Sequence, residues 1–424
     1  MRAGVAKVNI TPPVGLELSG WAFGPSVGIL DDLYAKVLLL ESDGRKVAII
    51  TTDLIGFNTE YATAIREGVA SKVNMNANDV LVSCSHTHSG PATMRLRRWG
   101  EVDEDYIHVV EKQIIGAATV AAKEMQEARI GAGKGRADGV GVNRRDREGG
   151  SVDTEVGVIR VDNSQGEMLA VLMNYSCHPV AAHNYKNMIS ADYPGYAMGV
   201  IEKTKQGRVI ALHTTGAAGD INPRQYHDIK YAEKWGNMVG GEALKVAESI
   251  ETRPDLTLNI VSERVNLPVR KLPTADELKK MIEEGNENLK KLEKEGTPVY
   301  HQLMGAYIPI EWAQEALEVV ETGRAVEHLE MEIQVVRLND AILVAMPGEI
   351  FVDIGLNIKQ ASPYPYTFVI EMANGAIAYL PTRKAFEVGG YEPEHAAKIY
   401  GTYLLTSDTQ NIIEEGVNRI IRRV

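Results

Sequence analysis

The chain has 424 residues, of which 44% are hydrophobic, and a formal net charge of −12. This length allows a large buried core, and the acidic balance argues against nucleic acid or an anionic membrane surface as a partner. No apolar run has the roughly 18 residues of a membrane span, and the N-terminus lacks the apolar stretch of a secretory signal. The two cysteines, Cys84 and Cys177, are too few for a disulfide framework. We therefore expect a cytoplasmic protein without stable membrane insertion that acts on a small-molecule substrate. Self-association into a homo-oligomer stays open.

Strand-like and helix-like segments alternate along the chain. Apolar runs of strand length occur at 33–42, 46–54, 79–85, 155–162, 168–176, 208–215, 256–267, 331–339, 341–347 and 366–372. Helical periodicity occurs at 57–72, 104–127, 194–205, 228–250, 274–294, 311–322 and 408–423. This alternation predicts an α/β fold in which a mixed β-sheet core is flanked by helices. We expect residues 1–424 to form a single domain.

A highly charged segment interrupts this alternation. Residues 274–296 read TADELKKMIEEGNENLKKLEKEG, with the capping-box spacing at Thr274 and Glu277 and a glycine stop at Gly296. We expect residues 274 to about 325 to form a helical insertion whose charges face solvent. The glycine-rich residues 131–150 lack the GKS or GKT ending of a phosphate loop, so we expect no nucleotide site there.

The segment DVLVSCSHTHSGP carries the clearest chemistry. An apolar strand leads into His86 and His88, and a Ser-Gly-Pro loop follows. In extended backbone, side chains two residues apart project to the same side, so both imidazoles would face one site. Neutral imidazole is the commonest zinc ligand. Two loop histidines with only local hydrogen bonds are the structural alternative.

Two further strand ends carry groups that bind metals. The strand MLAVLMNYS ends at His178, with His183 nearby as a helper or a bystander, and AILVAMP is followed by Glu349. A glutamate directly after a buried strand is costly unless it is paired or coordinated. Two histidine-bearing strand ends in one α/β protein favour a shared metal. Taken alone, His178 would more often be a structural histidine, and Glu349 fits a structural role and a ligand role equally.

The segment HTTGAAGDINPR places Asp220 and Asn222 in a small-residue turn after another strand. Small residues let backbone amides approach a substrate closely, whereas Asp and Asn also serve as local caps in tight turns. Other hydrolase patterns are missing: the chain has no HxHxDH, no HExxH and no GxSxG motif.

Together these motifs resemble the catalytic domain of the neutral (neutral/alkaline, non-lysosomal) ceramidase family. The resemblance rests on NITPPVGLELSGW, SHTHSGP, VNR, GDINP, PGE, AYLPT and YEPEHA, which occur in the family's order over nearly the whole chain. It implies zinc ligands at His86, His178, Glu349 and Tyr379. It further implies that His88 handles a proton, that Arg144 contacts the substrate or oxyanion, and that Tyr391 is a second active-site tyrosine.

The chain departs from the family in two ways. Ceramidases carry a serine in a GDxSPN segment, where this chain has Asn222. They are also longer and end in an immunoglobulin-like domain, which we do not expect here. We therefore expect a zinc-dependent hydrolase that cleaves an amide bond of a small soluble substrate with metal-activated water, with Asp220 and Asn222 on the substrate side. The alternatives are a zinc esterase, lactonase or glycoside-cleaving hydrolase, a true ceramidase, or a non-catalytic metal-binding homologue.

Overall fold

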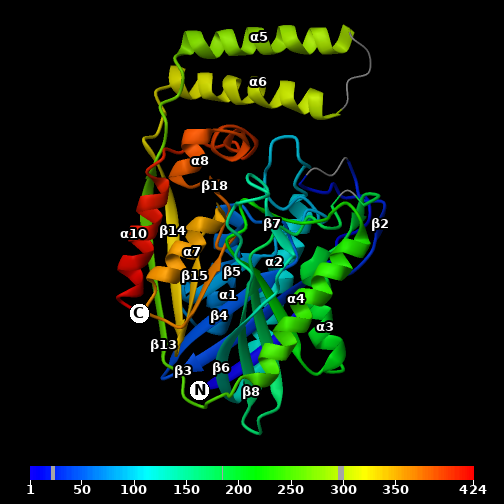
Figure 1. Ribbon diagram of the computed structural model, residues 1–424, viewed down its shortest axis with the longest axis vertical. Coiled ribbons are helices and arrows are strands. Elements are labelled where there is room, and N and C mark those ends of the chain that lie inside the picture. Colours follow the sequence, from blue (N-terminus) through cyan, green and yellow to red (C-terminus); the bar gives the residue numbers. More distant parts are fainter. Residues whose placement is uncertain (21–23, 184, 295–299) are drawn as a thin grey trace.

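Two β-sheets lie face to face at the centre of the computed structural model, which describes residues 1–20, 24–183, 185–294 and 300–424 (Figure 1). Within these residues the larger sheet has eight strands, in the order β11-β9-β8-β6-β1-β3-β4-β5. Their bounds are Ile210–Thr215, Met168–Tyr175, Glu155–Asn163, Gln126–Arg136, Arg2–Asn9, Tyr34–Ser42, Arg45–Thr52 and Val80–Cys84. The other sheet has the order β13-β14-β15-β17, with bounds Leu258–Pro268, His328–Leu338, Ala341–Ala345 and Tyr366–Ile370.

Alternation along the strands explains why the sheets pack together. In β3, Leu38 and Leu40 belong to the core between the sheets, where they join Leu343 and Phe368 of the second sheet. Leu39, between them, faces the opposite way into a core formed with helices. Successive side chains of a strand point to opposite faces, so strands that are apolar throughout are buried on both. The result is a four-layer α/β/β/α arrangement.

Helices cover both outer faces. The helices over the larger sheet are α1 (Thr59–Val73), α2 (Glu104–Lys123), α3 (Asp192–Thr204) and α4 (Ile229–Ser249). Those over the smaller sheet are α7 (Val352–Ala361) and α10 (Thr409–Ile421). The short helices α8 (Arg383–Val388) and α9 (Ala396–Ile399) follow the second sheet in sequence. No described helix has the length and apolar character needed to span a bilayer.

Short strand pairs join the loops at one end of the sheets. These pairs are β2 (Gly28–Ile29) with β10 (Met188–Ile189), β7 (Gly141–Asn143) with β12 (Ile221–Pro223), and β16 (Glu349–Ile350) with β18 (Tyr379–Leu380). In the last pair Glu349 and Tyr379 are direct register partners. Backbone pairing therefore brings together residues that lie far apart in the chain.

The mixed α/β fold and the predicted strands are confirmed to within a few residues, but the strand at the start of the glycine-rich segment was not predicted. Residues 126–136 form strand β6, and the helix predicted to reach 127 ends at Lys123. Three alternate glycines of β6 lie under α4. A Cβ atom on Gly133 would lie 2.9 Å from Ile250, and one on Gly135 would lie 2.1 Å from Glu242. These glycines permit close helix packing on a regular strand.

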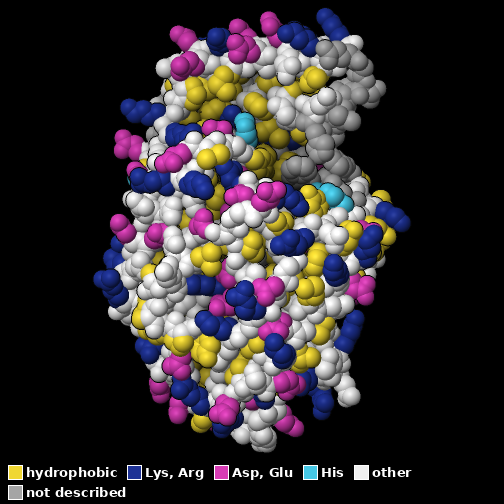
Figure 2. Space-filling view, in the orientation of Figure 1, with side chains coloured by type: hydrophobic (Ala, Val, Ile, Leu, Met, Phe, Trp, Pro, Cys, Tyr) yellow, Lys and Arg dark blue, Asp and Glu magenta, His cyan; other side chains and the backbone are white. Residues whose placement is uncertain are grey.

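The predicted charged insertion is a pair of helices, α5 (Ala275–Lys294) and α6 (Tyr300–Glu321), which projects from the sandwich (Figure 1). Figure 2 shows this hairpin as a ridge with apolar side chains toward the hollow beneath it. Helix α6 begins eleven residues before the predicted start, because Pro309 lies inside the helix and obscured the periodicity. The hairpin has a small core of its own around Leu278 and Trp312, and Ile308 of α6 joins the main core.

An ion pair connects the helical layer with the second sheet. Arg66 of α1 and Glu332 of β14 form two hydrogen bonds, of 2.7 and 3.0 Å, and both side chains are mostly buried. Burial alone would raise the pKa of Glu332, but Arg66 and Ser262 outweigh it and hold the pKa below its ordinary value. The pair therefore stabilises the fold above about pH 4.3, and this contribution is lost as the pH falls through the lowered pKa.

We predict that Glu332→Gln lowers the free energy of unfolding at pH 7 by about 1.5–3 kcal/mol, because a hydrogen-bonded charge pair is lost. The difference from the unsubstituted protein shrinks as the pH falls below 4. Urea unfolding followed by circular dichroism at several pH values measures both effects. The control is Glu330→Gln, two residues away on the same strand, whose ion pair with Arg264 is exposed. Equal losses in the two variants would contradict the prediction.

Candidate metal centre

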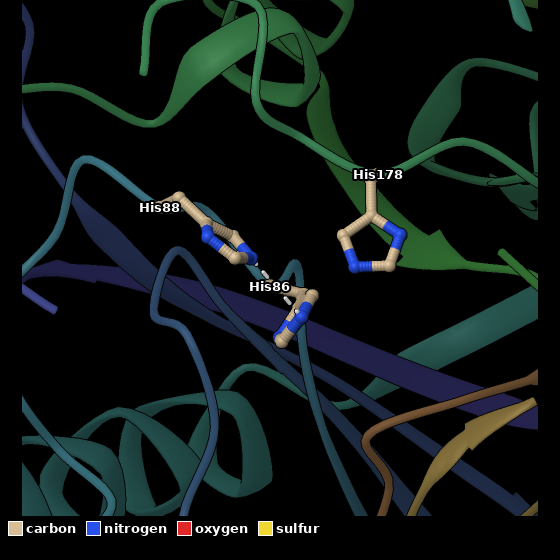
Figure 3. A group of neighbouring side chains, drawn as sticks. All are labelled: His86, His88 and His178. Atoms are coloured by element: carbon tan, nitrogen blue, oxygen red, sulfur yellow. Dashed lines mark hydrogen bonds between the residues drawn. The ribbon is translucent and has the colours of Figure 1, made fainter. Parts of the chain in front are cut away.

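Three histidines converge from two loops at the ends of strands (Figure 3). His86 and His88 follow β5, and His178 follows β9. Their ring nitrogens lie within 4.8 Å of one another, and all three residues are buried. Figure 3 shows the rings of His86 and His88 pointing toward each other, with His178 approaching from a separate element.

Backbone carbonyls fix the tautomer of each histidine. Nδ1 of His86 donates to the carbonyl of Ile55 at 2.6 Å, and Nδ1 of His178 donates to that of Ala218 at 2.6 Å. Nδ1 of His88 lies 3.1 Å from the carbonyl of Gly20. Since a carbonyl only accepts, each Nδ1 carries the hydrogen, and Nε2 of a neutral ring presents a lone pair. Burial lowers the pKa of His88 and His178, which favours the neutral form of both rings.

The lone pairs of His86 and His178 face one carboxylate oxygen. Oε2 of Glu349 lies 2.9 Å from Nε2 of His178 and 3.4 Å from Nε2 of His86. Nε2 of His178 and Oε2 of Glu349 are fully buried and make no hydrogen bond within the described residues. Electron-rich atoms at such distances repel each other unless a cation lies among them. These atoms form a group that could hold a metal ion.

The spacing fits zinc. With ligand bonds of about 2.0–2.1 Å in tetrahedral geometry, two ligand atoms lie about 3.3 Å apart. The observed separations around Glu349 are close to this value. Nε2 of His88 lies 3.2 Å from Nε2 of His86, so His88 stands as near as the implied ligands do. The division of His86 as ligand and His88 as proton carrier therefore stays a prediction.

The geometry that brings His86 and His88 together differs from the one we expected. Strand β5 ends at Cys84, and His86 has a φ of +68°, in the left-handed region. The backbone at His86 is therefore not extended, and the predicted reason for the two rings to share a face does not apply. They meet because the strained turn at His86 directs its ring toward that of His88, with ring centroids 4.7 Å apart. Such strain in a non-glycine residue is typical of functional sites.

Tyr379 and Arg144 adjoin Glu349. Nη2 of Arg144 donates to the Tyr379 hydroxyl at 3.1 Å and to the Gly219 carbonyl at 2.7 Å. Burial and the neighbouring Glu349 raise the pKa of Tyr379, whereas Arg144 lowers it. The net result is a pKa well above the ordinary value, and the Arg144 guanidinium opposes this shift by favouring the phenolate, the form in which tyrosine binds a metal.

A second arginine completes a cluster around one glutamate. Glu392 is buried and accepts hydrogen bonds from Nε of Arg144 at 2.9 Å and from Arg145. Arg145 also donates to the carbonyl of Gly389 at 2.7 Å. Glu392 therefore holds both guanidinium groups in fixed positions beside the metal centre.

A cavity of about 560 Å³ opens onto this centre. Its volume lies in the range of small-molecule sites. The lining residues are His88, Trp99, Arg144, Arg145, His178, Val180, His183, Asn222, Tyr226, His227, Tyr379, Tyr391 and Glu392. A larger cleft of about 880 Å³, lined by Gly131 and Arg253 among others, contains none of the clustered histidines. The chemistry therefore favours the smaller cavity as the active site.

The predicted site residues fall into two groups. His88, Arg144, His178, Asn222, Tyr379 and Tyr391 line the cavity, and His86 and Glu349 lie beneath it. Asp220, which we expected on the substrate side, does not line the cavity. Its carboxylate accepts from the amide of Val352 at 2.8 Å and from Asn143 at 2.9 Å, so it holds the start of α7 against β7. Asp220 is a local cap, the alternative that the turn composition left open.

Sequence reasoning missed several residues of the site. Trp99, Arg145, Tyr226, His227 and Glu392 line the cavity, and Tyr400 donates a hydrogen bond to Glu349. Arg145 and Glu392 directly follow Arg144 and Tyr391, so sequence adjacency offered a hint for them. Tyr400 lies in a segment without a recognisable motif, and only the fold brings it to the metal centre.

Known proteins similar to this chain are neutral ceramidases. The sequence profile described as neutral/alkaline non-lysosomal ceramidase, N-terminal, matches residues 1–229. Neutral ceramidase A of Dictyostelium discoideum is 23% identical over 215 residues, which cover 44% of this chain and 30% of that protein. The neutral ceramidase of Pseudomonas aeruginosa is 25% identical over 248 residues, which cover 52% of this chain and 37% of that protein.

A solved structure shows the same fold. The crystal structure of neutral ceramidase from Pseudomonas aeruginosa superposes with a TM-score of 0.75 and 18% identity, covering 100% of this chain and 75% of that one. In the sequence comparisons, the matched region spans about a third of the length of the curated relatives.

We predict that His86→Ala and His178→Ala lose bound metal, whereas His88→Ala keeps the metal and loses turnover. The first two substitutions remove lone pairs that face Glu349, and the third removes the histidine implied to carry a proton. Zinc content by mass spectrometry, after dialysis against the metal, measures the difference. His108→Ala, which changes an exposed histidine, is the control. Unchanged zinc content in all four variants would refute the metal centre.

Proposed function

Because the profile match covers more than half of its residues, the chain belongs to the neutral/alkaline non-lysosomal ceramidase family, and we propose that it is a zinc-dependent hydrolase of amide bonds. The observation that carries the proposal is the convergence of histidine and glutamate lone pairs beneath an open cavity. Bound zinc supplies the Lewis acidity that polarises a carbonyl and makes water nucleophilic near neutral pH.

Residues of the chain itself would transfer the proton, stabilise the negative charge and position the charged groups. His88 lines the cavity with Nδ1 held by the Gly20 carbonyl, so its Nε2 carries the lone pair that would accept a proton from water and return it to the leaving amine. Arg144 and Tyr391 lie on the cavity wall near Tyr379, where they stabilise negative charge on the former carbonyl oxygen. Glu392 keeps Arg144 in position during the reaction.

We propose an N-acyl lipid of the ceramide class as the substrate. The matching relatives are named neutral ceramidases, which favours such a lipid over the small soluble substrate expected from the sequence. Trp99, Val180 and Tyr226 give the cavity apolar wall area beside its polar floor. That combination suits an amide next to hydrocarbon chains, with the amide toward the histidines.

The test is hydrolysis by the purified, zinc-loaded protein of N-acylsphingosines with short and long acyl chains, each offered in detergent. A soluble N-acetyl amino acid, a fatty ester and a glycolipid form the comparison panel. The proposal predicts release of fatty acid from the N-acylsphingosines. Turnover of the soluble amide alone would restore the small-substrate hypothesis, and turnover of the ester or glycolipid alone would replace the amide by another bond. No turnover of any compound would favour a non-catalytic homologue.

We predict that Arg144→Ala lowers kcat by about 10²–10³-fold, the usual effect of removing one donor to an oxyanion. Asn222→Ala should have a much smaller effect, because Asn222 has no nucleophilic hydroxyl and only accepts a hydrogen bond from Arg144 at 3.3 Å. Both side chains line the same cavity, so each variant controls for the other. A larger loss of kcat in Asn222→Ala would contradict this assignment of roles.

A further inference from the structure

Tyr400 is the residue directly after helix α9, and its side chain reaches the candidate metal centre. Its hydroxyl donates a hydrogen bond to Oε1 of Glu349. The other carboxylate oxygen, Oε2, is the one that faces His86 and His178. The two oxygens of Glu349 therefore have different environments, one with a phenol and one with the histidine nitrogens.

The two tyrosines beside Glu349 differ in chemical role. The Tyr379 hydroxyl oxygen accepts a hydrogen bond from the Arg144 guanidinium at 3.1 Å. The Tyr400 hydroxyl instead donates to a carboxylate oxygen of Glu349. The rings of Tyr379 and Tyr400 meet edge to face, with centroids 6.1 Å apart. One phenol is thus suited to bind a metal, and the other to orient a ligand.

The backbone that carries Tyr400 is held from outside the site. The amide of Arg97 donates to the Ile399 carbonyl at 2.7 Å, and Nε of Arg97 donates to the Lys398 carbonyl at 3.0 Å. The guanidinium of Arg97 pairs with Glu315 of α6 at 2.7 Å. Helix α6 of the charged insertion therefore helps to place Tyr400.

We propose that Tyr400 is a positioning residue that restricts Glu349 to one metal-facing oxygen. A carboxylate that is free to turn binds a metal through both oxygens and fills a position that a catalytic site keeps open for water. By holding Oε1, Tyr400 leaves Oε2 as the single ligand atom and preserves the open position. Hydrogen bonds to ligating carboxylates have this orienting effect in metal sites. This inference rests on the proposed metal-dependent function.

The test replaces zinc by cobalt(II) and compares visible absorption spectra of the unsubstituted protein and Tyr400→Phe. Four-coordinate cobalt absorbs strongly, and higher coordination numbers weaken the bands. We expect Tyr400→Phe to bind cobalt with weaker bands and to lose about 10–100-fold in kcat. KM should change little, because Tyr400 does not line the substrate cavity.

Tyr106→Phe is the matched control, since that buried phenol donates to the Ile10 carbonyl at 2.6 Å. It should leave the spectrum and kcat unchanged. If Tyr400→Phe does not fold, Arg97→Lys loosens the same segment and should weaken the bands in the same direction. Cobalt binding with an unchanged spectrum in the folded variant would overturn the role of Tyr400 and leave the metal centre intact. Failure of the unsubstituted protein to bind cobalt would overturn the metal centre, and with it this inference.

Discussion

The repulsion among buried lone pairs is the constraint on which the site depends. Nε2 atoms of three histidines and one oxygen of Glu349 gather in a region shielded from water. Each histidine is oriented by a carbonyl from a different part of the chain, those of Gly20, Ile55 and Ala218. Folding therefore brings these groups together against their mutual repulsion, and the proposed metal ion would relieve that repulsion. A site organised in advance binds its metal without rearranging.

A buried glutamate links the parts that hold this assembly. Oε2 of Glu371 accepts from the amide of Ala218 at 3.1 Å and from the amide of Ile350 at 3.0 Å. Ala218 supplies the carbonyl that orients His178, and Ile350 follows Glu349. Burial, reinforced by the nearby charge of Glu349, raises the pKa of Glu371 well above its ordinary value. One side chain thus fixes the relative positions of two ligands that lie 171 residues apart in the sequence.

Much of the fold was predictable because its strands are buried on both faces and its helices on one. Periodicity located most of these elements within a few residues, but it missed β1 and α7 and the first half of α6. It also could not reveal β6, whose glycines serve close packing with α4. Periodicity also gave no indication of two stacked sheets, since stacking depends on which face of one sheet packs against which face of the other. In the candidate site, His86, His178 and Glu349 could be identified because each follows the end of an apolar strand. The pairing of Glu349 with Tyr379 depends on strand register, which local sequence patterns do not show. The position of Tyr400 depends on the chain segment that Arg97 holds, so local patterns did not show it either.

The most direct measurement is anomalous X-ray scattering at the zinc absorption edge from crystals grown with zinc. If the ligands are assembled as the structure shows, one strong peak lies between Nε2 of His86, Nε2 of His178 and Oε2 of Glu349, at bonding distance from each. A peak elsewhere, or no peak with the histidine and glutamate side chains in unchanged positions, would contradict a metal centre at this site.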